Sequence, residues 1–333
     1  MGSSLFLIAI IAVSLLFVFI NGFHDTANVV ATPIATRSLS PYQAIVIAAI
    51  FNFIGAFFGT GVAVTISKGL IDSTLVTHMV LVAALSSAIL WNLITWAFGI
   101  PSSSSHALIG SLAGAGIATG GIRAVNYTTL VDKVIIPMVL SPIMAFILAL
   151  IIVVIVMRVL QNNTTPRKAN NFIRELQVLS SSLLAFSHGS NDAQKNMSII
   201  VLALFSFGLL PNVVHIPFWV TSLCGIAMAL GTLSGGMKII KTLSTRVAKL
   251  RPANGFSAEL SSGLLIFAAS HFGLPVSTTQ AVSGSIMGAG STGKVGVNWS
   301  VARQMATAWA LTLPSCIVFS AIIYKILFWA FGG

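Results

Sequence analysis

The sequence predicts an all-α integral membrane protein built from two similar halves, and three observations lead to this fold class. Of the 333 residues, 56% are hydrophobic and only 7% are charged, whereas about 25% of the residues in an ordinary soluble domain are charged. Long apolar segments recur along the whole chain. Each half of the chain also presents the same polar motifs in the same order. A soluble domain could not cover its surface with so few charges.

Eight apolar segments are long enough to be membrane segments or parts of them. A helix needs about 20 apolar residues to cross a bilayer, and several of these segments reach that length alone. Counting helices that break inside the membrane, we predict ten to twelve segments in a multi-pass protein of the cell (plasma) membrane. The first segment has no basic residues before it and no convincing cleavage site, so we interpret it as a retained span. The segments are 4–20, 44–66, 81–98, 134–157, 199–210, 216–233, 260–272 and 301–331.

Basic residues dominate the few charges and give the chain a net charge of +11. They gather in two short stretches, and short loops rich in Lys and Arg lie on the cytoplasmic side of membrane proteins. We therefore expect both stretches to be cytoplasmic and to contact the anionic lipid of the bilayer, with no role in binding nucleic acid. The stretches contain Arg158, Arg167, Lys168 and Arg174, and then Lys238, Lys241, Arg246, Lys249 and Arg251.

A polar stretch, QNNTTPRKANN, begins at Gln161 and divides the chain nearly in half. We predict a first transmembrane repeat at 1–160, a cytoplasmic basic linker at 161–175 and a second transmembrane repeat at 176–333. Each repeat carries a polar cluster within an apolar run, NGFHDTAN at 21–28 and SHGSNDAQKN at 187–196. We interpret both clusters as breaks in spanning helices. Secondary transporters are commonly built from inverted repeats with broken helices, and we predict that architecture here.

Later in each repeat comes a stretch that starts with proline and continues with hydroxyl residues and glycine. PSSSSHALIGSLAGAG begins at Pro101 and PVSTTQAVSGSIMGAG begins at Pro275, and the two are identical at eight of sixteen positions. Each is too short and too polar to cross the bilayer, so we predict two re-entrant hairpins. The downstream glycines and alanines would let these hairpins pack closely against neighbouring helices.

The serine and threonine residues that follow the proline of each stretch, here called the hydroxyl rows, predict an anion site. Proline suits the first turn of a helix, where free N–H groups and the helix dipole attract negative charge, and two such ends facing each other would surround a small tetrahedral anion. Serines that only cap buried helices would explain one stretch but not a matched pair. The candidate ligands are Ser102, Ser103, Ser104, Ser105, Ser277, Thr278 and Thr279, with Gln194 from the second polar cluster, and His106 and Gln280 are candidate supporting donors.

The two polar clusters predict cation sites, because each contains one aspartate and carboxylates at membrane depth usually mark ion pathways. We expect Na+ to bind the oxygens of Asp25 and Asn28, and those of Asp192 and Asn196. An anion imported against an inside-negative potential needs co-transported cations. The alternative is a structural role, and Lys195 could pair with Asp192. Candidate supporting residues are Asn21, His24, His188, Asn191 and Glu259.

NGFHDTANVVATPIATRSLSP and FSHGSNDAQKNMSI, each followed by a P-x-S-[ST]-[ST]-[HQ]-A stretch, resemble the inorganic phosphate transporter (PiT) family over almost the whole chain. The resemblance implies inorganic phosphate as the substrate, coupling to Na+ or H+, inverted repeats and a homodimer. It assigns the family's site to Asp25, Asn28, Asp192, Asn196 and the two hydroxyl rows. The chain departs from the family pattern at His24, which replaces an asparagine, and at Asn52, where some relatives have a glutamate. Both departures bear on the coupling ion.

We therefore predict a secondary active transporter, not an enzyme, that imports inorganic phosphate by symport with Na+ through alternating access, with no cofactor besides the coupling ion. A proton-coupled phosphate permease or a sulfate permease on the same scaffold is the alternative, because sulfate is also tetrahedral. A channel is a further alternative, which would show uptake without saturation. An intramembrane hydrolase is disfavoured, because Ser105 and His106 point about 100° apart on a helix and Gln280 replaces the histidine in the second stretch.

Overall fold

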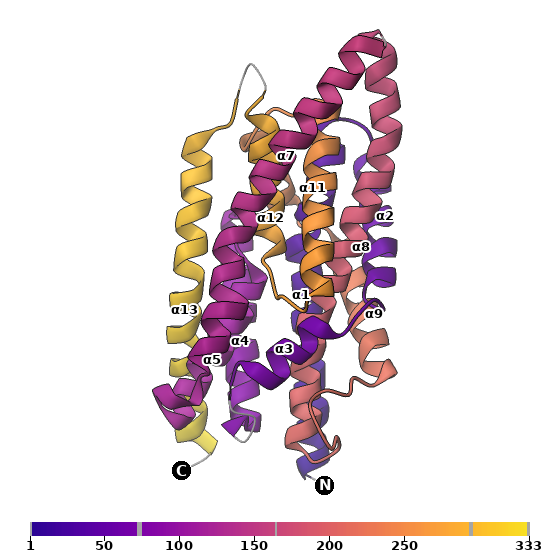
Figure 1. The fold of residues 1–333 in the computed structure, drawn as a ribbon. Coiled ribbons are helices and arrows are strands. Elements are labelled where there is room, and N and C mark those ends of the chain that lie inside the picture. Colours follow the sequence, from indigo (N-terminus) through magenta and orange to yellow (C-terminus); the bar gives the residue numbers. More distant parts are fainter. Residues whose placement is uncertain (1, 72–74, 164, 293–295, 332–333) are drawn as a thin grey trace.

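Helices make up the fold in the computed structural model, which describes residues 2–71, 75–163, 165–292 and 296–331. These residues contain no strand, only the isolated bridges Ile71–Val125 and Ala248–Val297. Most helices run along one long axis, with both termini at one end and the turn between α7 and α8 at the other (Figure 1). The all-α class predicted from the sequence is confirmed.

The described helices fall into two successive sets. The first set is α1 (Gly2–Ala35), α2 (Pro41–Gly55), α3 (Gly61–Gly69), α4 (His78–Phe98), α5 (Ser104–Gly120), α6 (Tyr127–Thr129) and α7 (Ile136–Asn163). The second set is α8 (Pro166–Ser206), α9 (Phe218–Ser234), α10 (Met237–Lys241), α11 (Pro252–His271), α12 (Thr278–Gly290) and α13 (Trp299–Phe331). Short 3-10 or π-helical turns lie at Ile122–Ala124, Leu130–Ile135 and Thr242–Arg246.

Four described helices are long and apolar enough to cross a membrane, and they are Phe6–Ala35, His78–Phe98, Tyr127–Leu160 and Trp299–Phe331. A fifth span arises if Phe218–Ser234 and Met237–Arg246, which are bent by 61°, count as one. This number is lower than the predicted ten to twelve segments. The reason is length and polarity, since α2, α5 and α12 have only 15, 17 and 13 residues, and a lone span needs about 20.

The predicted breaks in the helices at the two polar clusters are wrong. α1 continues from Gly2 to Ala35 through the first cluster, and α8 continues from Pro166 to Ser206 through the second. The glycines in these clusters serve close packing instead. A Cβ atom at Gly22 would lie 2.4 Å from the carbonyl oxygen of Met228 in α9, and one at Gly189 would lie 2.2 Å from that of Asn52 in α2. Each glycine therefore lets its helix touch a helix of the other set.

Two helical hairpins follow the same plan, α4 with α5 and α11 with α12. Figure 1 shows the first in the lower part of the molecule and the second in the upper part. A serine pair joins the two helices of each hairpin, since Ser111 donates to Ser87 and Ser261 donates to Ser285, both at 2.9 Å between oxygens. Ser111 and Ser285 each lie ten residues after the proline of their stretch (111 − 101 and 285 − 275).

The returning helix of each hairpin packs against the last helix of the other set, α5 against α13 and α12 against α7. The approach is close enough to require glycine. A Cβ atom at Gly114 would lie 2.1 Å from the carbonyl oxygen of Ile317, and one at Gly288 would lie 2.1 Å from that of Phe146. The expectation that small residues let these hairpins pack tightly is confirmed at both positions.

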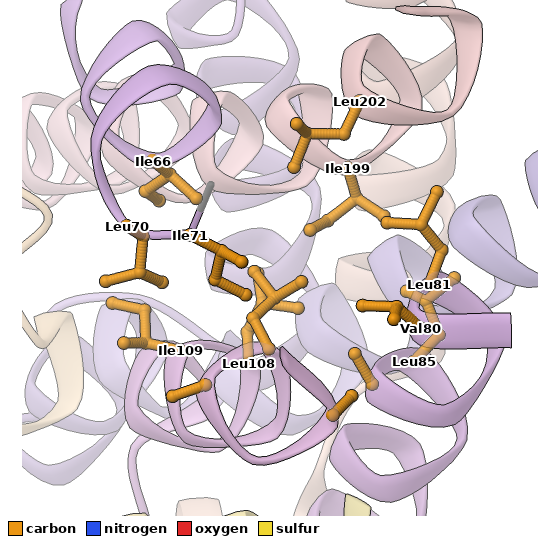
Figure 2. Packing of buried hydrophobic residues seen from close by; sticks show 14 of the residues in the cluster. Ile66, Leu70, Ile71, Val80, Leu81, Leu85, Leu108, Ile109, Ile199 and Leu202 are labelled. Carbon is orange, nitrogen blue, oxygen red and sulfur yellow. The ribbon is translucent and has the colours of Figure 1, made fainter. Parts of the chain in front are cut away.

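An apolar core holds the first hairpin in place against α3 and α8. Figure 2 shows Leu81 and Leu85 of α4 together with Leu108 and Ile109 of α5, facing Ile199 from α8. These side chains are at most 1% exposed. Between helices of a membrane protein such side chains contribute through van der Waals packing, so this cluster holds the hairpin against α3 and α8.

The predicted linker at 161–175 is mostly helical, because α7 ends at Asn163 and α8 begins at Pro166, while Thr164 lies outside the described residues. The α7–α8 turn and the start of α11 lie at the same end of the molecule (Figure 1). Lys249 and Arg251, just before α11, therefore share that end with the basic residues around the α7–α8 turn. Lys238, from the same basic stretch, lies beside the C-terminal end of α4, since it donates to the carbonyl oxygen of Ala97 at 3.2 Å.

Candidate functional site

The tips of the two hairpins bring two helix N-termini together inside the protein. Ser103 caps α5 by accepting from the N–H of His106, and Ser277 caps α12 by accepting from the N–H of Gln280, both at 3.2 Å. Ser105 donates to the carbonyl oxygen of Val276, just before α12, at 3.4 Å. Both hydroxyl rows predicted from the sequence therefore meet at one place.

The first two N–H groups of each of these helices have no hydrogen-bond partner among the described residues. They belong to Ser104 and Ser105 in α5 and to Thr278 and Thr279 in α12. Free N–H groups at a helix start carry partial positive charge and bind anions. Two such ends thus offer four backbone donors to one small anion.

Asp25 of α1 reaches both hairpins. Ser104 donates to its Oδ2 atom at 2.6 Å, and Thr279 donates to its Oδ1 atom at 3.3 Å. His24 contacts Oδ1 through Nδ1 at 2.7 Å. Asn28, one turn further along α1, donates from Nδ2 to the hydroxyl of Thr279 at 2.9 Å, and its Oδ1 atom has no partner among the described residues.

Asp192 of α8 occupies the corresponding place in the second set of helices. Thr278 donates to its Oδ2 atom at 3.2 Å, which matches the contact between Ser104 and Asp25 because each hydroxyl lies three residues after its proline. Lys195 donates to Oδ1 at 2.7 Å. His188 approaches Oδ2 through Nε2 at 3.4 Å.

The two aspartates lie 167 residues apart in the sequence (192 − 25) but close together in the fold. Ligand atoms of Asp25, Asp192 and His188 all lie within 4.8 Å of one another. All three side chains are buried. Carboxylates this close disfavour joint ionisation unless positive charge accompanies them, and Lys195 supplies such a charge beside Asp192.

Residues just before the aspartates position the hairpin tips. His24 contacts the hydroxyl of Thr95 in α4 at 3.1 Å, and Asn191 donates to the hydroxyl of Ser270 in α11 at 2.8 Å. The histidine that departs from the family pattern thus makes the contact that an asparagine makes in the other set. Ser102 adds a hydrogen bond to Thr95 at 2.8 Å.

Several predicted site residues lie elsewhere. Gln194, predicted as a phosphate ligand, holds the loop between α2 and α3, since it donates to the carbonyl oxygen of Phe58 at 3.1 Å and accepts from the N–H of Val62 at 2.9 Å. Glu259 lies in a separate cluster, where Gln177 donates to it at 2.8 Å and Ser180 at 2.5 Å.

The remaining predicted residues are buried beside the site without a direct contact to either carboxylate. Asn196 donates only to the backbone carbonyl of Asp192, at 2.8 Å. Polar atoms without a partner among the described residues occur on Asn21, His106, Asn196 and Gln280. Asn52 belongs to the surroundings of the site, because its Oδ1 atom contacts Nδ1 of His188 at 3.1 Å. In the sequence, Asn52 stands out only as a departure from the family pattern, and nothing in its apolar surroundings predicts the contact with His188.

The site is closed to solvent in this conformation. The hydroxyl residues Ser104, Ser105, Thr278 and Thr279 are at most 3% exposed. Their hydroxyl groups donate to a carboxylate or to a backbone oxygen, whereas the N–H groups of the same residues stay free.

Comparison with known proteins places these features in a family context. A model of the phosphate transporter family matches residues 21–320. The chain is 47% identical to a Bacillus subtilis protein named "Probable low-affinity inorganic phosphate transporter", with 96% of both chains covered. It is 46% identical to a Rhizobium meliloti protein of the same name, covering 96% of this chain and 95% of that one. A solved structure titled "The sodium-dependent phosphate transporter" superposes with a TM-score of 0.89 at 25% identity, covering 97% of this chain and 98% of that one.

Proposed function

This chain belongs to the phosphate transporter family, and from that premise we propose that it imports inorganic phosphate together with Na+ by alternating access. It is a membrane transporter and not an enzyme. The observation that carries the proposal is the meeting of two capped helix N-termini between two buried aspartates. The solved structure that it resembles is titled as sodium-dependent, which supports Na+ as the coupling ion.

Phosphate binds between the hairpin tips in this proposal. The free N–H groups of Ser104, Ser105, Thr278 and Thr279 and their hydroxyls are the donors, and Ser103 and Ser277 shape the two helix starts as caps. A tetrahedral anion accepts hydrogen bonds in several directions, so donors from two opposed helix ends suit it. The hydroxyls that now donate to Asp25 and Asp192 turn to the anion when it binds.

Na+ binds at Asp25 and Asn28. Hard cations take carboxylate, amide and hydroxyl oxygens as ligands. Asp25 supplies a carboxylate, Asn28 supplies a buried Oδ1 atom with no partner among the described residues, and Thr279 lies in contact with both. One Na+ neutralises a phosphate monoanion, so the membrane potential, worth about 2.3 kcal/mol per charge per 100 mV, no longer opposes import.

Alternating access is inferred from the burial of the site and from the packing of each hairpin against the last helix of the other set. The site is buried, so each hairpin must move to open it to one side. α4 with α5 and α11 with α12 approach the site from opposite ends (Figure 1), which supports inverted repeats with two re-entrant hairpins. We propose that the remaining helices complete the ten to twelve membrane segments, and that the end with the α7–α8 turn faces the cytoplasm.

Cysteine labelling tests this orientation. Both native cysteines, Cys224 and Cys316, are buried, so a thiol introduced at an exposed position dominates labelling by a membrane-impermeant maleimide. Cysteine at Asn170 or Thr245 is expected to react in inside-out vesicles and not in intact cells. Reaction of either variant from outside intact cells would reverse the proposed orientation.

Phosphate specificity is tested against sulfate, the tetrahedral anion that the same donors would fit. Purified protein in proteoliposomes is expected to show saturable uptake of radiolabelled phosphate. Excess unlabelled phosphate should abolish that uptake. Sulfate at the same concentration should leave most of the phosphate uptake intact. Equal inhibition by both anions would favour a general tetrahedral-anion permease, and uptake that never saturates would favour a channel.

Proton coupling is the second candidate, favoured by the short contact between His24 Nδ1 and Asp25 Oδ1 at 2.7 Å. A proton shared by this pair could neutralise the carboxylate as Na+ does. The two candidates differ in one readout, because proton-coupled uptake would follow a pH gradient in the complete absence of Na+.

A further inference from the structure

Lys195 lies buried at the centre of the second half of the site. Its side chain is 2% exposed, and its ammonium nitrogen has three oxygen partners from three parts of the fold. It donates to Asp192 Oδ1 at 2.7 Å, to the hydroxyl of Ser105 at 2.6 Å and to the carbonyl oxygen of Val276 at 2.6 Å. A carboxylate, a hydroxyl and a carbonyl oxygen form the kind of ligand set that binds a small hard cation.

Asn28 is the counterpart of Lys195 in the first half. Each follows its aspartate by three residues (28 − 25 and 195 − 192) on an unbroken helix. Each also contacts the hydroxyl four residues after a hairpin proline, Thr279 for Asn28 and Ser105 for Lys195. Equal spacing and equivalent partners establish the match, in which one half carries a neutral amide and the other a positive charge.

The prediction of a second Na+ site at Asp192 and Asn196 meets this charge directly. Asp192 already has a cation at 2.7 Å, and the side-chain nitrogen of Asn196 donates to the backbone carbonyl of Asp192. An added Na+ would compete with the ammonium for the same carboxylate oxygen and would be repelled by it. Asn196 also lies one residue beyond the position that matches Asn28.

We propose that Lys195 is a built-in cation that takes the place of one coupling ion, so that only the half of the site around Asp25 binds an exchangeable Na+. This inference rests on the proposed function, and it specifies how many Na+ ions are transported with each phosphate. The ammonium neutralises Asp192 permanently and holds the tips of both hairpins together through Ser105 and Val276. The chain therefore carries one Na+ fewer per phosphate than a protein with two Asp-x-x-Asn sites.

A role for Lys195 as a direct phosphate ligand conflicts with its contacts. An ammonium group has three N–H donors, and all three have protein acceptors. The nearby hydrogen-bond donors that have no partner, and that could bind an anion, are backbone N–H groups instead. Lys195 thus sets the charge of the site and positions the hairpin tips, and phosphate is bound by other groups.

The test compares the number of Na+ ions bound per chain in wild-type protein and in Lys195→Asn, which gives the second half the Asp-x-x-Asn spacing of the first. Binding of radioactive Na+ to purified, detergent-solubilised protein is measured at saturating phosphate, and melting temperature and gel filtration verify folding. We expect one Na+ per wild-type chain and two per Lys195→Asn chain. Lys168→Asn makes the same substitution at an exposed lysine of α8 and should leave the number at one.

A folded Lys195→Asn protein that binds no additional Na+ would overturn the inference, and so would a wild-type chain that binds two. If Lys195→Asn does not fold, the reciprocal variant Asn28→Lys decides, with loss of the wild-type Na+ expected and an unchanged number contradicting it. Failure of the proposed function looks different. A wild-type chain without bound Na+ would refute sodium coupling, while the gain of one Na+ in Lys195→Asn would still uphold Lys195 as a built-in cation at Asp192.

Discussion

We expect Asp25→Asn to abolish Na+-driven accumulation of phosphate. The substitution keeps the size of the side chain and one oxygen that can accept from either Ser104 or Thr279, but it removes the charge that attracts Na+. Two unit charges about 4 Å apart interact by about 4 kcal/mol at an effective dielectric constant of 20, which corresponds to roughly a thousandfold in affinity. The measurement is phosphate uptake into proteoliposomes as a function of Na+ concentration.

Asp132→Asn is the matched control, because Asp132 is an exposed aspartate outside the site. It should retain the wild-type Na+ dependence. Melting temperatures of both variants separate loss of transport from loss of folding. An unchanged Na+ dependence in folded Asp25→Asn protein would mean that the carboxylate is structural and that Na+ binds elsewhere.

We expect the double variant Ser104→Ala, Thr278→Ala to lower phosphate affinity at saturating Na+ by at least a hundredfold. Each hydroxyl lies at a helix start that faces the other, and each donates to an anionic group in the closed structure. A hydrogen bond to a charged group contributes about 1.5–3 kcal/mol, so each single variant should lose roughly tenfold or more. The measurement is the KM for phosphate, determined separately from the KM for Na+.

Ser111→Ala is the control for this pair. Ser111 is a buried serine of the same helix α5, but it donates to Ser87 within the hairpin and does not contact the site. It should lower stability slightly and leave the KM for phosphate unchanged. A double variant with wild-type KM would place phosphate away from the hairpin tips.

The hydroxyl rows could be predicted from sequence because a helix start has a chemical signature. Pro101 and Pro275 mark where each hairpin tip ends, and the residues that follow supply the caps and donors that the structure brings together. Duplication made the signal specific. The repeat also indicated that Asp25 and Asp192 are a matched pair, but it did not predict that the two carboxylates lie close together.

The helix breaks and part of the ligand set could not be predicted, because the same residues serve more than one purpose. Gly22 and Gly189 indicate a break when they are considered alone, yet they permit contact with Met228 and Asn52 on helices distant in sequence. Gln194 adjoins the aspartate-containing cluster but points toward the α2–α3 loop. On an unbroken helix, direction changes by about 100° per residue, so neighbours in sequence face different surroundings.

Sodium coupling is the central claim, and accumulation of radiolabelled phosphate by proteoliposomes with an inward Na+ gradient tests it most directly. The account predicts that phosphate rises transiently above its external concentration and that a sodium ionophore abolishes the rise. An equal inward K+ gradient should give only slow equilibration. Accumulation that is the same in K+ as in Na+, and that is driven by an imposed pH gradient, would contradict sodium coupling and assign the role of the cation to a proton.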